Sequence, residues 1–263
     1  MHSFQTARAT LVTLLALCGT VAMADPDDSP VGPTHVALGD AANAKITRLA
    51  GDATAPVVVR DENEPWMYRA GEQYIGSPLP DGYPRPTAPG VVELKYFPSA
   101  RRAEFGGASN SGMRGFWPLF QHISSRDIAM TAPVEMDMDT DGMTMSFLYQ
   151  TRELGPVGEA EQGVVVRDTE PMWVVSKGFK GARTGSRVTQ SLAELRAMID
   201  ELDGWKATDQ TRWMGYNGPS TPRNKQWWEV QITVVPDLGN EGGDDEDDGA
   251  PVVEVDTPER LGG

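Results

Sequence analysis

The chain has 263 residues and a formal net charge of −15, with 38 acidic against 23 basic residues. An acidic chain repels the phosphate backbone of nucleic acids, so we expect no nucleic-acid partner. The single cysteine, Cys18, excludes an intramolecular disulfide, so stability has to come from a hydrophobic core.

The first 24 residues have the pattern of a secretory signal peptide. A basic Arg8 precedes an apolar run at 11–18, and Ala22-Met23-Ala24 forms an A-x-A cleavage site. The run is too short to span a membrane as a helix. We therefore expect a mature chain that starts at Asp25, is exported to the periplasm or the extracellular space, and contains no integral membrane segment.

Both flanks of the mature chain have unusual compositions. Residues 25–89 are rich in proline and glycine, which favours extended conformations over a packed core. We expect this leader to be extended or partly ordered, as a stalk or a strap, with Trp66, Tyr68 and Tyr74 available to pack onto the domain. Residues 237–263 carry ten acidic residues and one arginine, and we expect this acidic tail to be disordered.

Residues 90–236 are expected to form the folded domain. In its first half, residues 91–97 and 103–105 are strand-like, 112–124 is helix-like, and 143–149 alternates apolar and polar residues as a half-buried strand does. Asp141-Gly142 predicts a hairpin turn before this last strand.

The second half repeats this order. Residues 172–176 and 178–181 are strand-like and precede a helical apolar pattern from Leu192 to Leu202. Thr189 or Ser191 would cap this helix and Gly204 would end it, and residues 227–235 form a closing strand. Two strand-helix-strand-strand units predict an α+β domain with pseudo-twofold symmetry. In this scheme the segments 130–133 and 214–217 hold equivalent places in the two units.

Two adjacent segments carry a family resemblance. Residues 115–123 read G-F-W-P-L-F-Q-H-I, and residues 128–136 read I-A-M-T-A-P-V-E-M. Together they resemble the SOUL haem-binding family, in which a helix with an aromatic-Leu-aromatic pattern runs into a strand that reads I-A-M-T-A-P-V. Over residues 90–236 the resemblance implies a distorted antiparallel β-barrel, or curved sheets, with two flanking helices, as in bacterial effector-binding domains. It also implies haem or another tetrapyrrole as the ligand.

Haem is a flat apolar ring with an anionic edge, so its site needs an apolar cleft and cations for the propionates. Arg126 and Lys177 are the preferred cations, because they lie at the ends of elements beside the cleft that the resemblance implies. The alternatives are barrel core for the apolar residues and solvated charges for the cations. The candidate walls come from the helix and the methionine-rich hairpin after it: Phe116, Trp117, Phe120, Ile123, Met136 and Met138.

His122 is the only histidine in the expected domain, which makes it the candidate axial ligand to haem iron. The alternative is a residue near the helix C-terminus, where a partly charged imidazole suits the helix dipole. Axial ligation is not required by the resemblance, because members of the family can hold haem largely by apolar contact.

Motifs for catalysis are absent: the sequence contains no nucleophile elbow, no H-E-x-x-H and no Walker loop. Glu93, Glu104, Glu135 and Glu229 alternate with apolar strand residues and are expected to face outward. We therefore expect a non-enzymatic haem or tetrapyrrole carrier or buffer. Two alternatives stay open, namely an effector-binding module of the same fold for a non-haem small molecule or peptide, and a hydrolase with a buried glutamate as its base.

Overall fold

The computed structural model describes residues 42–61, 63–64, 67–107, 113–139 and 142–238. The expected signal peptide, the first part of the leader and nearly all of the acidic tail lie outside the described residues, as do Trp66 and Asp141. Among the described helices, none has both the length and the apolar character needed to cross a membrane.

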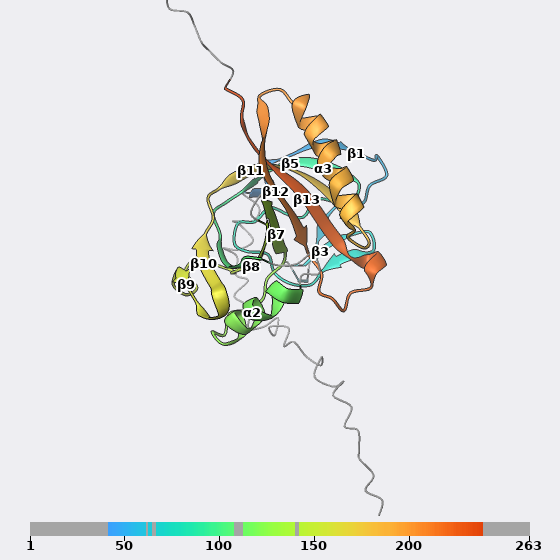
Figure 1. The fold of residues 1–263 in the computed structure, drawn as a ribbon. Helices are drawn as coiled ribbons and strands as arrows, with labels where there is room; N and C mark the ends of the chain where they lie inside the picture. Colours follow the sequence, from blue (N-terminus) through green and yellow to red (C-terminus); the bar gives the residue numbers. More distant parts are fainter. Residues whose placement is uncertain (1–41, 62, 65–66, 108–112, 140–141, 239–263) are drawn as a thin grey trace, which may run out of the picture.

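Ten antiparallel strands form one curved sheet, in the order β1-β5-β11-β13-β12-β7-β8-β6-β10-β9 (Figure 1). The sheet is open, because β1 and β9 are its two edges. The expected α+β class with curved sheets and two helices is thus confirmed, without closure into a barrel. The strands are β1 (Ile46–Gly51), β5 (Val91–Phe97), β6 (Arg101–Phe105), β7 (Val134–Asp139), β8 (Gly142–Leu148), β9 (Gly158–Glu159), β10 (Val164–Asp168), β11 (Met172–Lys180), β12 (Trp205–Gly215) and β13 (Trp227–Pro236).

The predicted duplication is present. β6 is followed by helix α2 (Met113–Ser124), β7 and β8, and β11 is followed by helix α3 (Gly185–Asp200), β12 and β13. The two units meet where β7 pairs with β12. The expected equivalence of 130–133 and 214–217 is wrong, because residues 130–133 precede β7 whereas Met214 and Gly215 end β12 and pair with Glu135 and Val134.

Helix α3 begins earlier than predicted. Its N-cap is Thr184, whose hydroxyl accepts a hydrogen bond from the Arg187 backbone N–H at 3.3 Å, so the cap predicted at Thr189 or Ser191 is wrong. The first turn is exposed and polar, and for this reason the apolar pattern does not reveal it. From Val188 onward the buried positions recur at helical spacing, through Ser191, Leu195 and Ile199.

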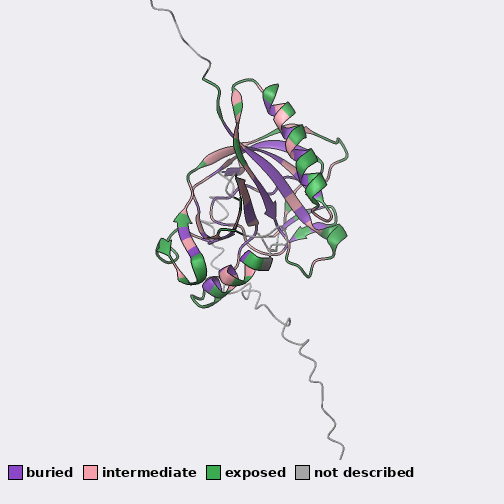
Figure 2. Cartoon of the chain, in the orientation of Figure 1, coloured by how far each residue is buried: buried purple, intermediate pink, exposed green. Residues whose placement is uncertain are grey.

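Alternation along the strands gives the sheet two different faces. Both helices contribute to the core on one face, called the helix face here, together with strand residues such as Met136, Trp213 and Ile232. The residues between them in sequence, such as Glu135, Arg212 and Gln231, point to the opposite face and are also buried. Figure 2 shows buried positions along the central strands and exposed ones along the outer side of α3.

The opposite face is covered by residues 78–89, called the strap here. Its Tyr83 ring meets Phe97 edge-on at a centroid distance of 5.1 Å, and its Thr87 is fully buried. The strap passes so close to β11 that a Cβ atom at Gly178 would lie 2.3 Å from the Thr87 carbonyl oxygen. Only glycine therefore fits at this position of β11.

The ordered fold starts before residue 90. β1 extends the main sheet by pairing with β5, and three short strands, β2 (Val59–Arg60), β3 (Tyr68–Ala70) and β4 (Gln73–Ile75), form a second sheet. The boundary expected at residue 90 therefore lies inside the fold. Of the leader tyrosines that were expected to pack onto the domain, Tyr68 is buried, whereas Tyr74 is 36% exposed.

Candidate functional site

Helix α2 presents an aromatic surface beside the sheet. Leu119, His122 and Ile123 are buried along one side of the helix, at a spacing that brings them onto one face. Trp117 is 53% exposed, and Phe116 and Phe120 are half-buried. The helix therefore has a packing side and a side that carries an unusually exposed aromatic ring.

The aromatic side chains of α2 contact one another in a continuous set. Phe116 and Phe120 stack with their centroids 5.7 Å apart, and Trp117 meets them edge-on at 5.6 and 6.0 Å. Phe116 also contacts Phe147 of β8 at 5.4 Å. This set connects an exposed tryptophan to the core and offers flat apolar contact to a planar ligand.

The methionine-rich hairpin is divided between core and surface. Met136 and Met145 pair across β7 and β8 and are buried, so Met136 is a core residue rather than a wall of an accessible cleft. Met138 and Met143 form the next pair on the same face and are half-buried. Of the two predicted methionines, Met138 is the one with an accessible side chain.

His122 faces inward. Its side chain is 5% exposed, its Nε2 lies 2.7 Å from the Tyr149 hydroxyl, and its Nδ1 is buried without a hydrogen-bond partner among the described residues. Burial, assisted by the nearby Arg126 guanidinium, lowers the pKa of His122 below its ordinary value. A neutral ring held by Tyr149 fits a structural role, and it gives little to the helix dipole. Axial ligation would require the ring to leave Tyr149 and turn outward.

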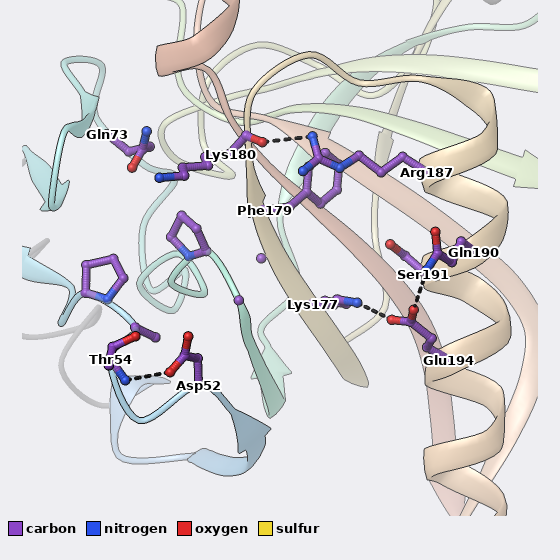
Figure 3. Close-up of a pocket in the computed structure, with 15 residues that line it drawn as sticks. Asp52, Thr54, Gln73, Lys177, Phe179, Lys180, Arg187, Gln190, Ser191 and Glu194 are labelled. Atoms are coloured by element: carbon purple, nitrogen blue, oxygen red, sulfur yellow. Dashed lines mark hydrogen bonds and ion pairs between the residues drawn. The ribbon is translucent and has the colours of Figure 1, made fainter.

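The two predicted cations lie in different surroundings. Arg126 follows α2 and donates from Nη2 to the Glu161 carboxylate at 2.6 Å. Lys177, on β11, forms an ion pair with Glu194 of α3 and lines a cavity of about 470 Å³ (Figure 3). None of the other predicted site residues lines this cavity. Of these two cations, only Arg126 lies beside helix α2 and its aromatic side chains.

A network of buried charges lies under the strap, where the sequence predicted solvent-facing glutamates. Glu135 and Glu229 are fully buried and Glu93 is 3% exposed, so the expected outward orientation of these three is wrong. Glu104 is half-buried between Arg102 and Arg167. Glutamates that alternate with apolar strand residues normally face water. Here the strap covers this face of the sheet, so these glutamates are buried.

Glu229 is held as a carboxylate by five groups, one of which is the Gln231 amide at 2.7 Å. Lys95 Nζ lies 3.1 Å from it, the hydroxyls of Ser176 and Tyr216 donate at 2.6 and 2.8 Å, and the Thr87 N–H donates at 2.6 Å. Burial raises the pKa of Glu229, but Lys95 and these donors outweigh it and leave the pKa below its ordinary value. Because its oxygens already accept these hydrogen bonds, the Glu229 carboxylate is not free to act as a general base.

Glu135 occupies a similar position on β7. Its carboxylate accepts hydrogen bonds from Arg102 and Arg212, both at 3.1 Å, and from the Tyr83 hydroxyl of the strap at 3.2 Å. The strap thus supplies hydrogen-bond donors to both buried glutamates. Sequence reasoning missed this network because its members come from segments far apart in the chain, and no local pattern pairs them.

Solved structures of similar fold have low sequence identity to this chain. EcmrR in its complex with DNA is 13% identical, with a TM-score of 0.45 over 55% of this chain and 57% of the EcmrR chain. The C-terminal domain of EcmrR is 15% identical, with a TM-score of 0.44 over 55% of this chain and 97% of that domain. A hydrolase from Listeria innocua is 10% identical, with a TM-score of 0.43 over 57% and 94%. Comparison with curated protein sequences gives no match.

Comparison with protein-family models gives a match to the SOUL heme-binding protein family over residues 87–233. The matched range is more than half of the chain. It begins in the strap, contains both helices and reaches into β13. It also includes the helix and the strand whose residues carry the resemblance. The chain therefore belongs to the SOUL haem-binding protein family.

Proposed function

We propose that this protein binds haem or another tetrapyrrole on the surface formed by α2 and the half-buried methionines of β7 and β8, and that it serves as an exported carrier or buffer for that ligand. Family membership supports the class of ligand. The observation that carries the location is Trp117, a large apolar ring that is 53% exposed beside Phe116 and Phe120. Clustered exposed aromatics mark surfaces that a ligand or partner covers.

The residues of this surface are suited to apolar contact with the porphyrin ring rather than to coordination of the iron. The three aromatic side chains offer flat contact, and Met138 and Met143, on the same sheet face as Phe147, offer adaptable thioethers. Arg126 and the exposed Arg114 supply positive charge for propionates. Haem would be held as cargo by apolar contact, with His122 supporting the helix from within.

Hemin titration tests the ligand and the location together. Purified protein is expected to give a saturable Soret shift with roughly one hemin per chain. Trp117→Ala is expected to weaken binding about tenfold or more, because burial of one large apolar side chain contributes about 1.5–3 kcal/mol. Tyr74→Ala, which removes another exposed aromatic ring from a distant strand, serves as the matched control and should leave the affinity unchanged.

The outcomes separate the proposal from its nearest alternative. If Trp117→Ala binds hemin as tightly as the wild-type protein, the hemin site does not lie on α2. No Soret shift at micromolar hemin, together with thermal stabilisation by other hydrophobic compounds that depends on Trp117, would favour the non-haem effector-binding module.

Export is the other part of the proposal, and it rests on residues 1–24, which lie outside the described ranges. Cells that express the full chain should accumulate, outside the cytoplasm, a form that begins at Asp25. Mass spectrometry of the N-terminal peptide measures this directly. Full-length protein that stays in the cytoplasm would contradict the exported role and leave haem binding to be judged separately.

A further inference from the structure

A polar cavity lies beside α3, apart from the aromatic surface of α2. It encloses about 470 Å³ between β11, the first half of α3, β4 and the loop at 52–56. Figure 3 shows polar side chains from all four segments around it. None of the aromatic or methionine residues assigned above to tetrapyrrole binding lines this cavity. Its lining includes Thr54, Gln73, Lys177, Lys180, Arg187 and Glu194.

Gln73 is the most informative residue of this cavity. It lies on β4 and is 3% exposed, and its amide nitrogen Nε2 has no hydrogen-bond partner among the described residues. A buried amide donor that stays unpaired lowers stability, and native proteins rarely tolerate one without a reason. An acceptor atom brought into the cavity by a ligand would satisfy it.

Two cations at the same cavity have no carboxylate partner in the described part of the chain. Arg187 donates from Nη1 to the backbone carbonyls of Lys180 and Ala182, which are neutral, and no ion pair involves the Lys180 ammonium. In Figure 3 the Lys180 side chain extends toward Gln73. The Arg187 guanidinium also lies 5.2 Å from the centroid of the Phe179 ring, so Arg187 is held on the α3 side of the cavity. The unpaired Gln73 amide and the Lys180 ammonium therefore lie together at one end of the cavity.

The other charges of the cavity are already satisfied. Lys177 is paired with Glu194, which also accepts a hydrogen bond from Gln190 at 2.9 Å. The Asp52 carboxylate accepts from the Thr54 N–H at 2.8 Å, and in Figure 3 these two residues lie away from Lys180 and Gln73. The groups left without a partner among the described residues are thus the Gln73 amide donor and the Lys180 ammonium, in a chain that carries a net charge of −15.

We propose that this end of the cavity binds the anionic group, a carboxylate or a phosphate, of a small organic molecule. Gln73 Nε2 donates to one oxygen of the group, and the Lys180 ammonium balances its charge. The cavity volume accommodates a molecule of several heavy atoms rather than a bare ion. This site is independent of tetrapyrrole binding at α2.

Calorimetric titration of the full chain with citrate and, separately, with inorganic phosphate tests the site at constant ionic strength. Saturable binding of citrate alone identifies a carboxylate site, and saturable binding of phosphate alone identifies a phosphate site. Lys180→Gln is expected to weaken binding about tenfold, as the loss of a charge-assisted contact implies. Lys225→Gln, a matched change at an exposed lysine outside the cavity, should have no effect.

Gln73→Leu distinguishes a ligand-binding glutamine from one that only stabilises the fold, because loss of the latter would lower stability. It removes the unpaired donor while keeping an apolar group of similar size, so the free protein should become more stable while anion binding weakens. Trp117→Ala should leave anion binding unchanged, which separates this site from the tetrapyrrole surface. The proposal is overturned if neither anion binds at millimolar concentration, if Lys180→Gln binds as well as Lys225→Gln, or if Gln73→Leu lowers the unfolding temperature of the free protein.

Discussion

The two faces of the main sheet are both buried, yet they use opposite chemistry. On the helix face, α2 and α3 pack over apolar side chains such as Met136, Trp213 and Ile232. On the other face, the strap packs over Glu135, Glu229 and the fully buried Lys95. The same strands supply both faces by alternation.

The difference lies in how each face gains its stability. The helix face gains it from apolar burial, which is non-directional and tolerates local repacking. The strap face depends on pairing each buried charge with specific partners, and one missing partner leaves a charge without compensation. We therefore expect substitutions on the strap face to be the more damaging, and substitutions on the outer side of α2 to affect binding without affecting stability.

Glu229→Gln is expected to have the largest effect. It removes the carboxylate that pairs directly with the fully buried Lys95, and breaking a buried pair in this way costs about 3–5 kcal/mol of unfolding free energy. Urea unfolding followed by tryptophan fluorescence measures the loss. Lys95→Met combined with Glu229→Leu should recover part of it, because no lone charge is left. A double variant whose loss equals the sum of the single losses would show that the pair is not coupled.

Leu119→Ala tests the packing side of α2. The side chain is fully buried, so its truncation should cost about 2–5 kcal/mol. Trp117→Ala, two positions earlier on the exposed side, should change the unfolding free energy by about 0.5 kcal/mol or less while it weakens hemin binding. Equal destabilisation by the two variants would remove the division of α2 into a packing side and a binding side.

The buried histidine predicts a pH dependence on the helix face. The pKa of His122 in the folded protein lies below its value of 6.5 in the unfolded chain, so the unfolded state binds more protons as the pH falls below that value. Stability should therefore decrease from about pH 7 to about pH 5. His122→Gln should flatten this part of the profile and leave the Soret spectrum of bound hemin unchanged. A changed Soret spectrum would instead identify His122 as an iron ligand.

The smallest effect is expected for Arg126→Ala. Its ion pair joins Glu161, whose side chain is 72% exposed, and exposed pairs contribute about 0–1 kcal/mol. The variant should unfold at nearly the wild-type urea concentration and bind hemin only slightly more weakly. A loss of hemin affinity as large as that of Trp117→Ala would give Arg126 a main role in holding the ligand.

Much of the helix face could be predicted from local patterns. β5 was predicted with its observed ends and α2 with almost the same bounds, because an apolar repeat within one segment determines each of them. The start of α3 was missed because its first three residues, 185–187, are exposed and have no apolar side chain facing the core. β1 to β4 were missed because the leader that contains them is rich in proline and glycine, and tertiary contacts with β5 and the core order it.

The strap face could not be predicted in the same way. A glutamate between apolar strand residues has the same sequence pattern whether water or a strap covers it. What distinguishes the two cases for Glu229 is Thr87, which lies 142 residues away along the chain. Gln73 of the cavity is likewise a polar residue of the leader with no motif around it. The aromatic side chains of α2 were predicted because they lie within five residues of one another in sequence and carry the family resemblance.

The contact between the strap and β13 has a consequence for synthesis of the chain. The Thr87 N–H donates to Glu229 and the Thr87 carbonyl accepts from the Trp227 indole, and these two partners in β13 follow Thr87 by 142 and 140 residues in the chain. The strap and the face it covers must wait for the C-terminal strand, and such long-range contacts form slowly. Until β13 is made, Thr87 and Lys95 lack the Glu229 carboxylate that both contact, so this charge network closes only at the end of folding.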